Sequence, residues 1–153
     1  MKVVFVSNSL DDTKKLALRI SKKLFVGAVI ALDGDLGAGK TTFTKFLAQG
    51  LEISEEVLSP TFNILRCYFS GKMPLYHIDA YRLEDQINND IGLEEVIEGD
   101  GVCVIEWGKF IASLIYEPLN IQISITSSNS RRFEISSEYP KYFDLLNDLK
   151  EMD

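Results

Sequence analysis

The amino-acid sequence predicts one α/β domain over residues 1–153, built on a mixed β-sheet with a parallel centre and antiparallel flanks. Short apolar runs typical of buried strands alternate with segments of helical periodicity, which is the pattern of a parallel sheet. At two places, strand-like runs follow each other across a polar turn, which indicates antiparallel hairpins. The 153 residues, 46% hydrophobic and 25% charged, have the composition of a single globular domain that buries its core without disulfides or metal.

The N-terminal part alternates predicted strands and helices. Val3–Val6 is a short apolar run, and Ser9 with Asp12 has the spacing of a helix capping box. The apolar residues beyond the box recur at helical spacing: Leu16, Ile20 and Leu24. A second apolar run, Ala28–Leu32, ends at a glycine-rich turn, and the helix predicted after that turn has one apolar face: Phe43, Phe46, Leu47 and Leu51.

The rest of the chain is richer in predicted strands. Residues 62–69 and 75–79 flank one turn, and residues 119–126 and 132–136 flank another, so each pair is predicted to form a hairpin. A compact apolar strand is predicted at 102–106. The predicted helical segments are 84–98, broken by Gly92; 110–116, as a short helix or turn; and a final helix opened by Pro140, bearing Tyr142, Leu145, Leu146 and Leu149.

The acidic charge of the chain restricts its expected partners. A formal net charge of −7 argues against a protein that holds RNA or DNA mainly through its own phosphate contacts, which need a basic surface. Such a protein can still act in a nucleic-acid pathway through protein partners. Cys67 and Cys103 are in no metal-ligand spacing and are predicted to be free thiols in a reducing compartment. The N-terminal apolar run is too short for a signal peptide, and no run is long enough to span a membrane, so we expect a cytoplasmic protein.

The glycine-rich turn matches a phosphate-binding motif. Its residues fit G-x-x-x-x-G-K-[ST], between an apolar strand and an amphipathic helix: Gly34, Gly39, Lys40 and Thr41. Glycines let successive backbone N–H groups face one anion, and the helix N-terminus adds partial positive charge. Lys40 supplies a cation for the β- and γ-phosphates of a nucleotide, and the Thr41 hydroxyl can ligate Mg²⁺. The motif therefore predicts a three-layer domain of the P-loop NTPase type; the alternative is an ordinary strand–turn–helix that uses glycines for tightness.

Two carboxylates are candidates for holding Mg²⁺ and activating water. Val102–Ile105 followed by Glu106 has the outline of a Walker B strand, with Glu in place of the commoner Asp. Leu75–Ile78 followed by Asp79 has the same outline less clearly. Either acid can instead be a surface residue at a strand end, and the pattern alone leaves this open.

Three further features have weaker signals. Ser59–Phe62 lies where nucleotide-sensing switch segments usually occur, although a plain loop containing proline has the same pattern. His77, the one histidine, is interpreted as a packed strand residue rather than a catalyst. Trp107 directly follows Glu106 and either shields the site or fills a gap in the packing.

Taken together, four blocks of sequence resemble the bacterial TsaE family, also called YjeE: Gly34–Thr42, Ser59–Phe62, Tyr76–Leu83 and Val104–Trp107. Their order and spacing agree with the family, as does Gly92–Glu95 between the third and fourth blocks. The resemblance covers nearly the whole chain, and four blocks in one order are far more specific than the phosphate motif alone. Phe62, where tyrosine is also common, and Lys109 after Glu-Trp-Gly are small departures.

The resemblance implies an ATPase, with ATP and Mg²⁺ as its cofactors, that is required to make threonylcarbamoyladenosine in tRNAs reading codons that start with A. In that family the protein acts with TsaB and TsaD, and TsaD transfers the threonylcarbamoyl group to the adenosine beside the anticodon. TsaC makes the threonylcarbamoyl-adenylate donor. The ATP cycle supports turnover of the TsaB–TsaD complex, so we expect slow hydrolysis by the protein alone and contact with tRNA only through the complex.

The resemblance also implies roles for individual residues. One set would wrap the phosphates: Gly37, Ala38, Gly39, Lys40, Thr41 and Thr42. Thr41 with Glu106 would hold Mg²⁺, and Asp79 would activate water or order the hydration shell of the metal. Thr61 would be the switch residue near the γ-phosphate. Two residues align only by looser pattern: Leu10, expected against the base, and Arg131, expected near the nucleotide.

Other nucleotide-binding classes fit the sequence less well. Small metabolite kinases usually carry an arginine-rich lid, and the few arginines of this chain form no such cluster. GTP-binding switches recognise guanine with Asn-Lys-x-Asp, which does not occur in the sequence. A catalytically idle scaffold is disfavoured by the two acids, Asp79 and Glu106.

Overall fold

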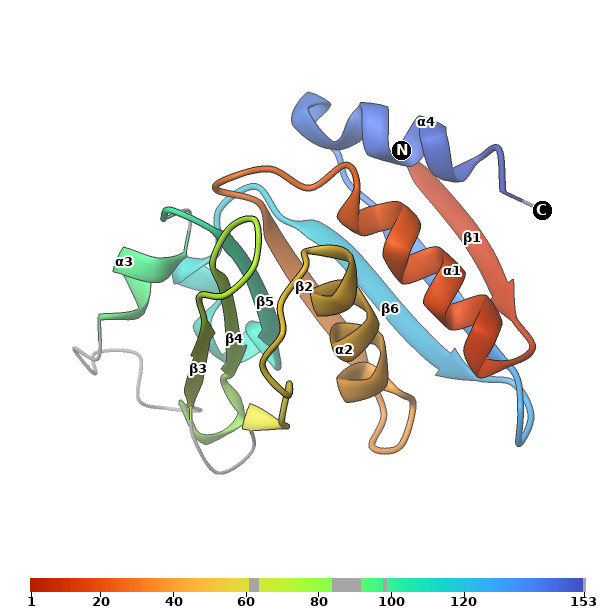
Figure 1. The fold of residues 1–153 in the computed structure, drawn as a ribbon, viewed down its shortest axis with the longest axis horizontal. Helices are drawn as coiled ribbons and strands as arrows, with labels where there is room; N and C mark the ends of the chain where they lie inside the picture. Colours follow the sequence, from red (N-terminus) through yellow and green to blue (C-terminus); the bar gives the residue numbers. More distant parts are fainter. Residues whose placement is uncertain (61–63, 84–91, 98, 153) are drawn as a thin grey trace.

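A computed structural model describes residues 1–60, 64–83, 92–97 and 99–152. The strands in these ranges form one seven-stranded sheet in the order β1-β7-β6-β2-β5-β4-β3. Strand β2 pairs in parallel with both β5 and β6, and β4 pairs in parallel with β5, whereas the pairs β1–β7, β6–β7 and β3–β4 are antiparallel. The predicted mixed sheet, parallel in its centre and antiparallel at its flanks, is confirmed (Figure 1). The strands are β1 Lys2–Ser7, β2 Val29–Gly34, β3 Leu65–Tyr68, β4 Leu75–Asp79, β5 Val102–Glu106, β6 Leu119–Ile125 and β7 Arg131–Ser136.

The helices lie close to their predicted positions. They are α1 Leu10–Ser21, α2 Lys40–Gly50, α3 Leu93–Val96 and α4 Phe143–Leu149, with 3₁₀ turns η2 Tyr81–Leu83, η3 Gly108–Leu114 and η4 Pro140–Tyr142. The predicted capping residue Ser9 is the N-cap of α1, and its hydroxyl accepts a hydrogen bond of 3.1 Å from the Asp12 N–H. The Asp12 carboxylate accepts from the Asn8 N–H at 2.9 Å, one residue earlier than in a standard capping box. Of the predicted 84–98 helix, only α3 falls within the described residues, beginning directly after Gly92.

Two hydrophobic cores lie on opposite faces of the sheet. The larger packs α1, α2 and α4 against one face, with Leu16, Phe43 and Leu146 fully buried (Figure 1). The smaller lies on the other face, where η2, α3 and η3 supply Leu83, Leu93 and Ile111 against β4 and β5. Every residue of β4 and β5 is therefore buried, whereas buried and exposed residues alternate along the first part of β6. The third layer of the predicted fold thus covers only the half of the sheet around β4 and β5.

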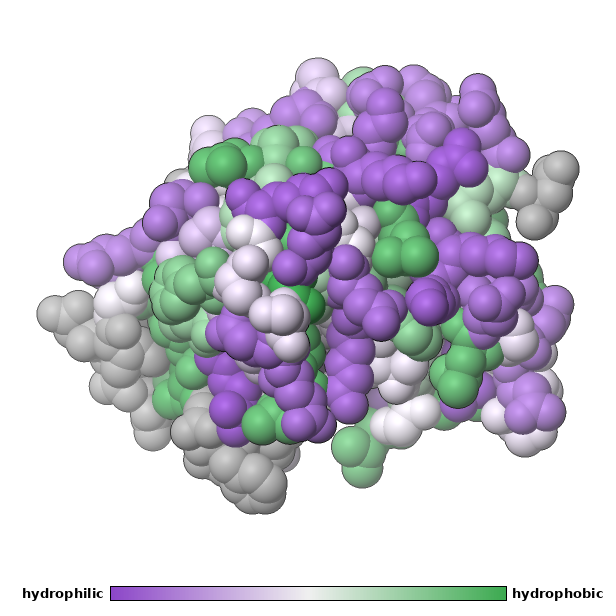
Figure 2. All heavy atoms as spheres, in the orientation of Figure 1, coloured by the Kyte–Doolittle hydropathy of each residue, from purple (hydrophilic) through white to green (hydrophobic). Residues whose placement is uncertain are grey.

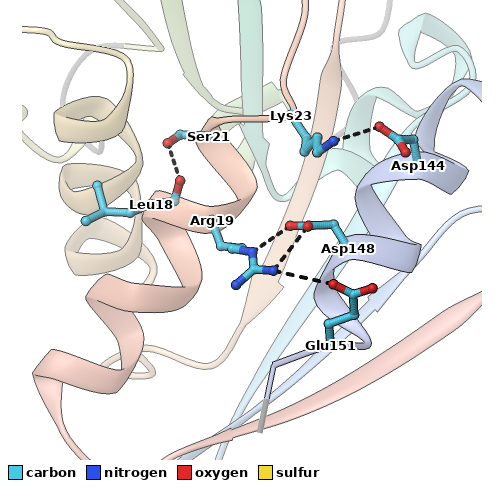
Figure 3. A network of polar contacts seen from close by, with 7 residues as sticks. All are labelled: Leu18, Arg19, Ser21, Lys23, Asp144, Asp148 and Glu151. Atoms are coloured by element: carbon cyan, nitrogen blue, oxygen red, sulfur yellow. Dashed lines mark hydrogen bonds and ion pairs between the residues drawn. The ribbon is translucent and has the colours of Figure 1, made fainter.

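Helix α4 is joined to α1 by charged side chains on the outside of the larger core (Figure 3). The guanidinium of Arg19 donates two hydrogen bonds to Asp148, at 2.7 and 3.1 Å, and lies 4.0 Å from Glu151. Lys23 donates to Asp144 at 3.0 Å. These contacts link segments from opposite ends of the chain, so we call this group of residues the α1–α4 clasp.

The surface over α1, α2 and α4 is largely hydrophilic, with hydrophobic residues scattered singly or in small groups (Figure 2). None of the described helices combines the length and the apolar character that crossing a bilayer requires. Both cysteines are free thiols, with Cys67 exposed and Cys103 buried. Burial raises the pKa of the Cys103 thiol to about 12, so this residue acts as a small core side chain.

Candidate nucleotide-binding site

The phosphate motif forms the turn between β2 and α2. Gly39 is the N-cap of α2 and has a φ of 105°, a conformation that side-chain-bearing residues rarely adopt. Gly34 lies so close to β6 that an added Cβ would stand 2.9 Å from the Ile123 carbonyl oxygen. The two glycines of the motif are therefore required for different reasons, one by backbone conformation and the other by close approach. The turn leaves the N-terminus of α2, an 11-residue helix, directed at the end of the parallel strands, where an anion is favoured.

The two predicted acids lie next to each other at that same edge of the sheet. Asp79 and Glu106 end adjacent parallel strands and are register partners. Both are largely buried, with 8% and 6% of their surfaces exposed. The Nζ atom of Lys40 lies 3.7 Å from Oε1 of Glu106 and 5.3 Å from the centre of the Trp107 ring. Oδ1 of Asp79 accepts a hydrogen bond of 3.0 Å from the backbone N–H of Tyr81. The predicted catalytic residues are thus brought together, and neither acid is an ordinary surface residue at a strand end.

A cavity of about 570 Å³ opens in front of these side chains. Its lining combines the turn, the start of α2 and both strand ends: Leu36, Gly37, Gly39, Lys40, Thr41, Thr42, Ser59, Asp79, Tyr81, Glu106 and Trp107. We call it the phosphate-side cavity. Ser59 is the residue of the predicted switch segment that lines it, whereas Thr61, the predicted switch residue, lies outside the described residues.

A second cavity, of about 710 Å³, lies on the other side of the turn. It is lined by both loosely aligned residues, Leu10 and Arg131, and also by Ala38. Gly37, Gly39 and Thr42 line both cavities, so the two are neighbours across the turn. Leu10 is 69% exposed and presents an apolar surface at the wall of this cavity. We call this the base-side cavity.

Arg131 has a structural contact that the sequence did not reveal. Its Nε donates to the carbonyl oxygen of Ala38 at 3.1 Å, and its Nη1 donates to the carbonyl oxygens of Ser127 and Ser130, both at 3.0 Å. The guanidinium therefore links the β6–β7 turn to the glycine-rich turn between β2 and α2. The structure places Arg131 at the wall of the base-side cavity, with several of its N–H groups directed at the protein itself.

Sequence reasoning missed the partner of His77. This residue is completely buried, as predicted, but its Nε2 lies 2.6 Å from Oε2 of Glu106. The signal was present in the strand periodicity: His77 and Asp79 are two residues apart in β4 and therefore point to the same face of the sheet. What the sequence lacked was the parallel pairing of β4 with β5 that places Glu106 beside them.

Trp107 belongs to an aromatic cluster at the entrance of the phosphate-side cavity. It stacks on Phe110 with ring centres 5.8 Å apart and meets the edge of Tyr81 at 5.0 Å. The Nζ atom of Lys109 lies 5.2 Å from the centre of the Trp107 ring. The indole therefore both packs against neighbours and borders the cavity beside Lys40, which combines the two roles that its sequence position left open.

The residues around the phosphate-side cavity fit Mg²⁺ better than a transition metal. The available donors are oxygens: the Thr41 hydroxyl and the carboxylates of Glu106 and Asp79. Across the described ranges, no three His, Cys, Asp or Glu side chains gather into a metal cage. Mg²⁺ needs no such cage, because it is usually bound through one or two protein oxygens together with substrate phosphates and water.

Comparison with known proteins places this geometry in a family. Residues 7–135 match the model of the family described as "Threonylcarbamoyl adenosine biosynthesis protein TsaE". The tRNA threonylcarbamoyladenosine biosynthesis protein TsaE of Bacillus subtilis is 42% identical over 144 residues, covering 94% of this chain and 90% of that protein. The protein of the same name from Treponema pallidum is 43% identical over 135 residues, covering 86% of this chain and 98% of its own.

A solved structure agrees with both sequence comparisons. The crystal structure of Bacillus subtilis YdiB superposes with a TM-score of 0.84 at 33% identity, covering 98% of this chain and 95% of that one. The fold, the order of the motifs and the sequence identity over most of the chain lead to one assignment. The chain belongs to the TsaE family of threonylcarbamoyl adenosine biosynthesis proteins.

Proposed function

We propose that this protein binds ATP with Mg²⁺ and hydrolyses it, and that the ATP cycle supports turnover of a TsaB–TsaD complex in tRNA threonylcarbamoyladenosine synthesis. The observation that carries the proposal is the convergence of Lys40, Asp79 and Glu106 in one cavity at the N-terminus of α2. A cation, two carboxylates and a helix N-terminus are the groups needed to hold a nucleotide's phosphates, a divalent cation and a water molecule.

Each part of the site has a physical role in this proposal. The backbone N–H groups from Gly37 to Thr42 hold the β- and γ-phosphates, and the ammonium of Lys40 turns from Glu106 toward them. The Thr41 hydroxyl and the Glu106 carboxylate would hold Mg²⁺, and the metal would supply positive charge to offset the charge developing on the phosphate oxygens. Asp79 accepts a proton from water or orients that water toward the γ-phosphate. The base lies in the base-side cavity, beside Leu10 and Arg131.

The same site supplies a way for nucleotide to act on a partner. Tyr81 and Trp107 both line the phosphate-side cavity, and Tyr81 is 55% exposed. A group that touches phosphate-binding residues on one side and solvent on the other can change the outer surface when ATP becomes ADP. We therefore propose that nucleotide state sets affinity for the TsaB–TsaD complex and that the protein alone hydrolyses slowly.

The test combines partner binding with a modification assay. The TsaB–TsaD complex is titrated against the protein with an ATP analogue, with ADP and without nucleotide, and multiple-turnover tRNA modification is measured with wild-type protein and Lys40→Ala. The expected result is a different affinity in at least one state, with nucleotide affinity shifted by the same factor when the partners are present. Lys40→Ala is expected to weaken nucleotide binding and abolish multiple turnover. Equal partner affinity in all three states, with modification sustained by Lys40→Ala, would overturn the proposal.

A further inference from the structure

His77 occupies an unusual place for a polar side chain. It lies in the middle of β4 with 0% of its surface exposed, on the sheet face that packs against α2. Its neighbours on that face are of two kinds. Leu75 before it on β4 and Val104, its register partner on β5, are apolar. Asp79 after it on β4 and Arg66, its register partner on β3, are charged. An aliphatic residue would fill such a position without the cost of removing an imidazole from water.

The two ring nitrogens of His77 differ in their hydrogen bonding. Nε2 lies 2.6 Å from Oε2 of Glu106, and because a carboxylate accepts, Nε2 is the donor. Nδ1 is buried and has no hydrogen-bond partner within the described part of the chain. A buried polar atom without a partner lowers stability. The polar contact that the structure gives the ring is therefore the one to Glu106.

That contact divides the two oxygens of Glu106 between two tasks. Oε2 accepts the hydrogen bond from the buried His77 ring. Oε1 lies 3.7 Å from the Nζ atom of Lys40, a residue that lines the phosphate-side cavity. A glutamate side chain has three rotatable bonds, and a hydrogen bond at 2.6 Å from a fully buried ring fixes its terminal group. With Oε2 occupied, Oε1 is the oxygen left to face a cation or a phosphate-bound metal.

From this geometry we propose that His77 is a positioning residue, which orients the Glu106 carboxylate so that Oε1 meets the Mg²⁺ of a bound nucleotide. This inference rests on the proposed function, because it assigns Glu106 to the metal. Groups that orient a metal ligand through a hydrogen bond typically change metal affinity or activity by about 10- to 100-fold when removed. His77 acts through Glu106 and touches neither nucleotide nor metal.

Two variants of the same residue separate positioning from packing. His77→Leu removes the donor and keeps an apolar group in the core, whereas the amide of His77→Gln can still donate to Glu106 from a similar distance along the side chain. Tyr142→Phe is the matched control, since the Tyr142 hydroxyl accepts from the Val29 N–H at 2.8 Å at the opposite end of the same sheet. This control loses two buried hydrogen bonds far from the site, since the hydroxyl also donates to the Val29 carbonyl oxygen at 3.2 Å.

Two readouts are needed. The first is the affinity for a fluorescent non-hydrolysable ATP analogue with EDTA and over a Mg²⁺ titration. The second is ATP hydrolysis over the same titration, with thermal unfolding to confirm folded protein. In His77→Leu we expect the Mg²⁺ concentration for half-maximal effect to rise about 10-fold or more, with analogue affinity in EDTA changed less than about threefold. We expect His77→Gln to stay within about threefold of wild type, and Tyr142→Phe to unfold at lower temperature with unchanged Mg²⁺ dependence.

The outcomes distinguish this inference from the proposed function. Unchanged Mg²⁺ dependence in His77→Leu overturns it, and so does an equal rise in His77→Gln or in Tyr142→Phe. If wild-type analogue binding does not respond to Mg²⁺, the inference fails together with the metal assignment. If Mg²⁺ strengthens analogue binding to the wild type without any hydrolysis, the proposed ATPase activity alone fails. In that case the loss of the Mg²⁺ response in His77→Leu still supports the positioning role.

Discussion

Two groups of charged side chains in this molecule look alike in their residue types and differ in almost everything else. In the α1–α4 clasp, Arg19 and Lys23 pair with Asp148 and Asp144 on the outside of the protein, and the side chain of Asp144 is 82% exposed (Figure 3). At the candidate nucleotide site, Lys40 and Glu106 form a pair whose side chains are only 11% and 8% exposed.

The difference in burial between the two groups matters because removing a charge from water costs free energy. Surface pairs keep most of their hydration, so each contributes little and each is readily accommodated. Removing both charges of a pair from water costs several kcal/mol per ion, and an apolar pair of similar volume is often at least as stable. Docking of α4 on α1 is enough to explain the ion pairs of the clasp. Stability does not explain the buried Lys40–Glu106 pair, so we infer that this pair serves a function. Strained or costly groups of this kind are characteristic of sites that act on a ligand.

The largest effect is expected from removing the acid at the centre of the buried group. Glu106→Ala should leave a folded protein whose ATP hydrolysis falls about 100-fold or more, because a metal-orienting carboxylate supplies several kcal/mol of transition-state stabilisation. The measurement is steady-state phosphate release with saturating Mg²⁺, with Asp79→Ala assayed in parallel. Near wild-type hydrolysis in Glu106→Ala together with an inactive Asp79→Ala would mean that the two acids have each other's roles.

A smaller effect follows from the pairing of Lys40 with Glu106. The Lys40 ammonium cannot pair fully with the Glu106 carboxylate and with a phosphate at the same time. We therefore expect the Lys40–Glu106 ion pair to compete with nucleotide binding when no metal is present. Glu106→Gln keeps the size of the side chain and removes the charge. We expect it to bind ATP in EDTA about fivefold more tightly than wild type, while the benefit of adding Mg²⁺ becomes smaller. The measurement is calorimetric titration of ATP in the two buffers, and weaker binding of ATP in EDTA would contradict the competition.

How far the sequence predicts each region depends on how local its information is. Apolar runs and turn signals predicted the strands and their hairpins, because each is encoded within a few residues. The motif at Gly34–Thr41 and the acids at two strand ends predicted most of the site for the same reason. The partner of His77 could not be predicted, since Glu106 is 29 residues away and the contact exists only through the pairing of β4 with β5. The clasp, between segments over 120 residues apart, is equally non-local.

The incomplete third layer shows the same limit. The residues of β6 alternate between apolar and polar, and the alternation does correspond to one buried and one open face. Which helices cover which strands is decided by the strand order, in which β2 lies between β5 and β6. Propensity and periodicity carry no information on that order. They predicted a three-layer domain but could not predict that one layer covers only half of the sheet.

The smallest effect is expected in the exposed group, the α1–α4 clasp, and it should depend on pH. Two hydrogen bonds from Arg19 hold the pKa of the Asp148 carboxyl below its usual range. A carboxyl whose pKa is lower in the folded than in the unfolded protein stabilises the fold above the unfolded value of about 3.9. That stability is lost as the pH falls through the lower folded value.

We therefore expect Asp148→Asn to lower the unfolding temperature at pH 7 by only a degree or two, as for other exposed pairs. The difference from wild type should shrink as the pH falls below about 4. Thermal unfolding of both proteins between pH 7 and pH 3 measures this, with Asp144→Asn as a control at the more exposed pair. A loss of nucleotide binding in Asp148→Asn, or a temperature difference that is the same at pH 3 as at pH 7, would contradict the view that the clasp serves only to dock α4 through charge.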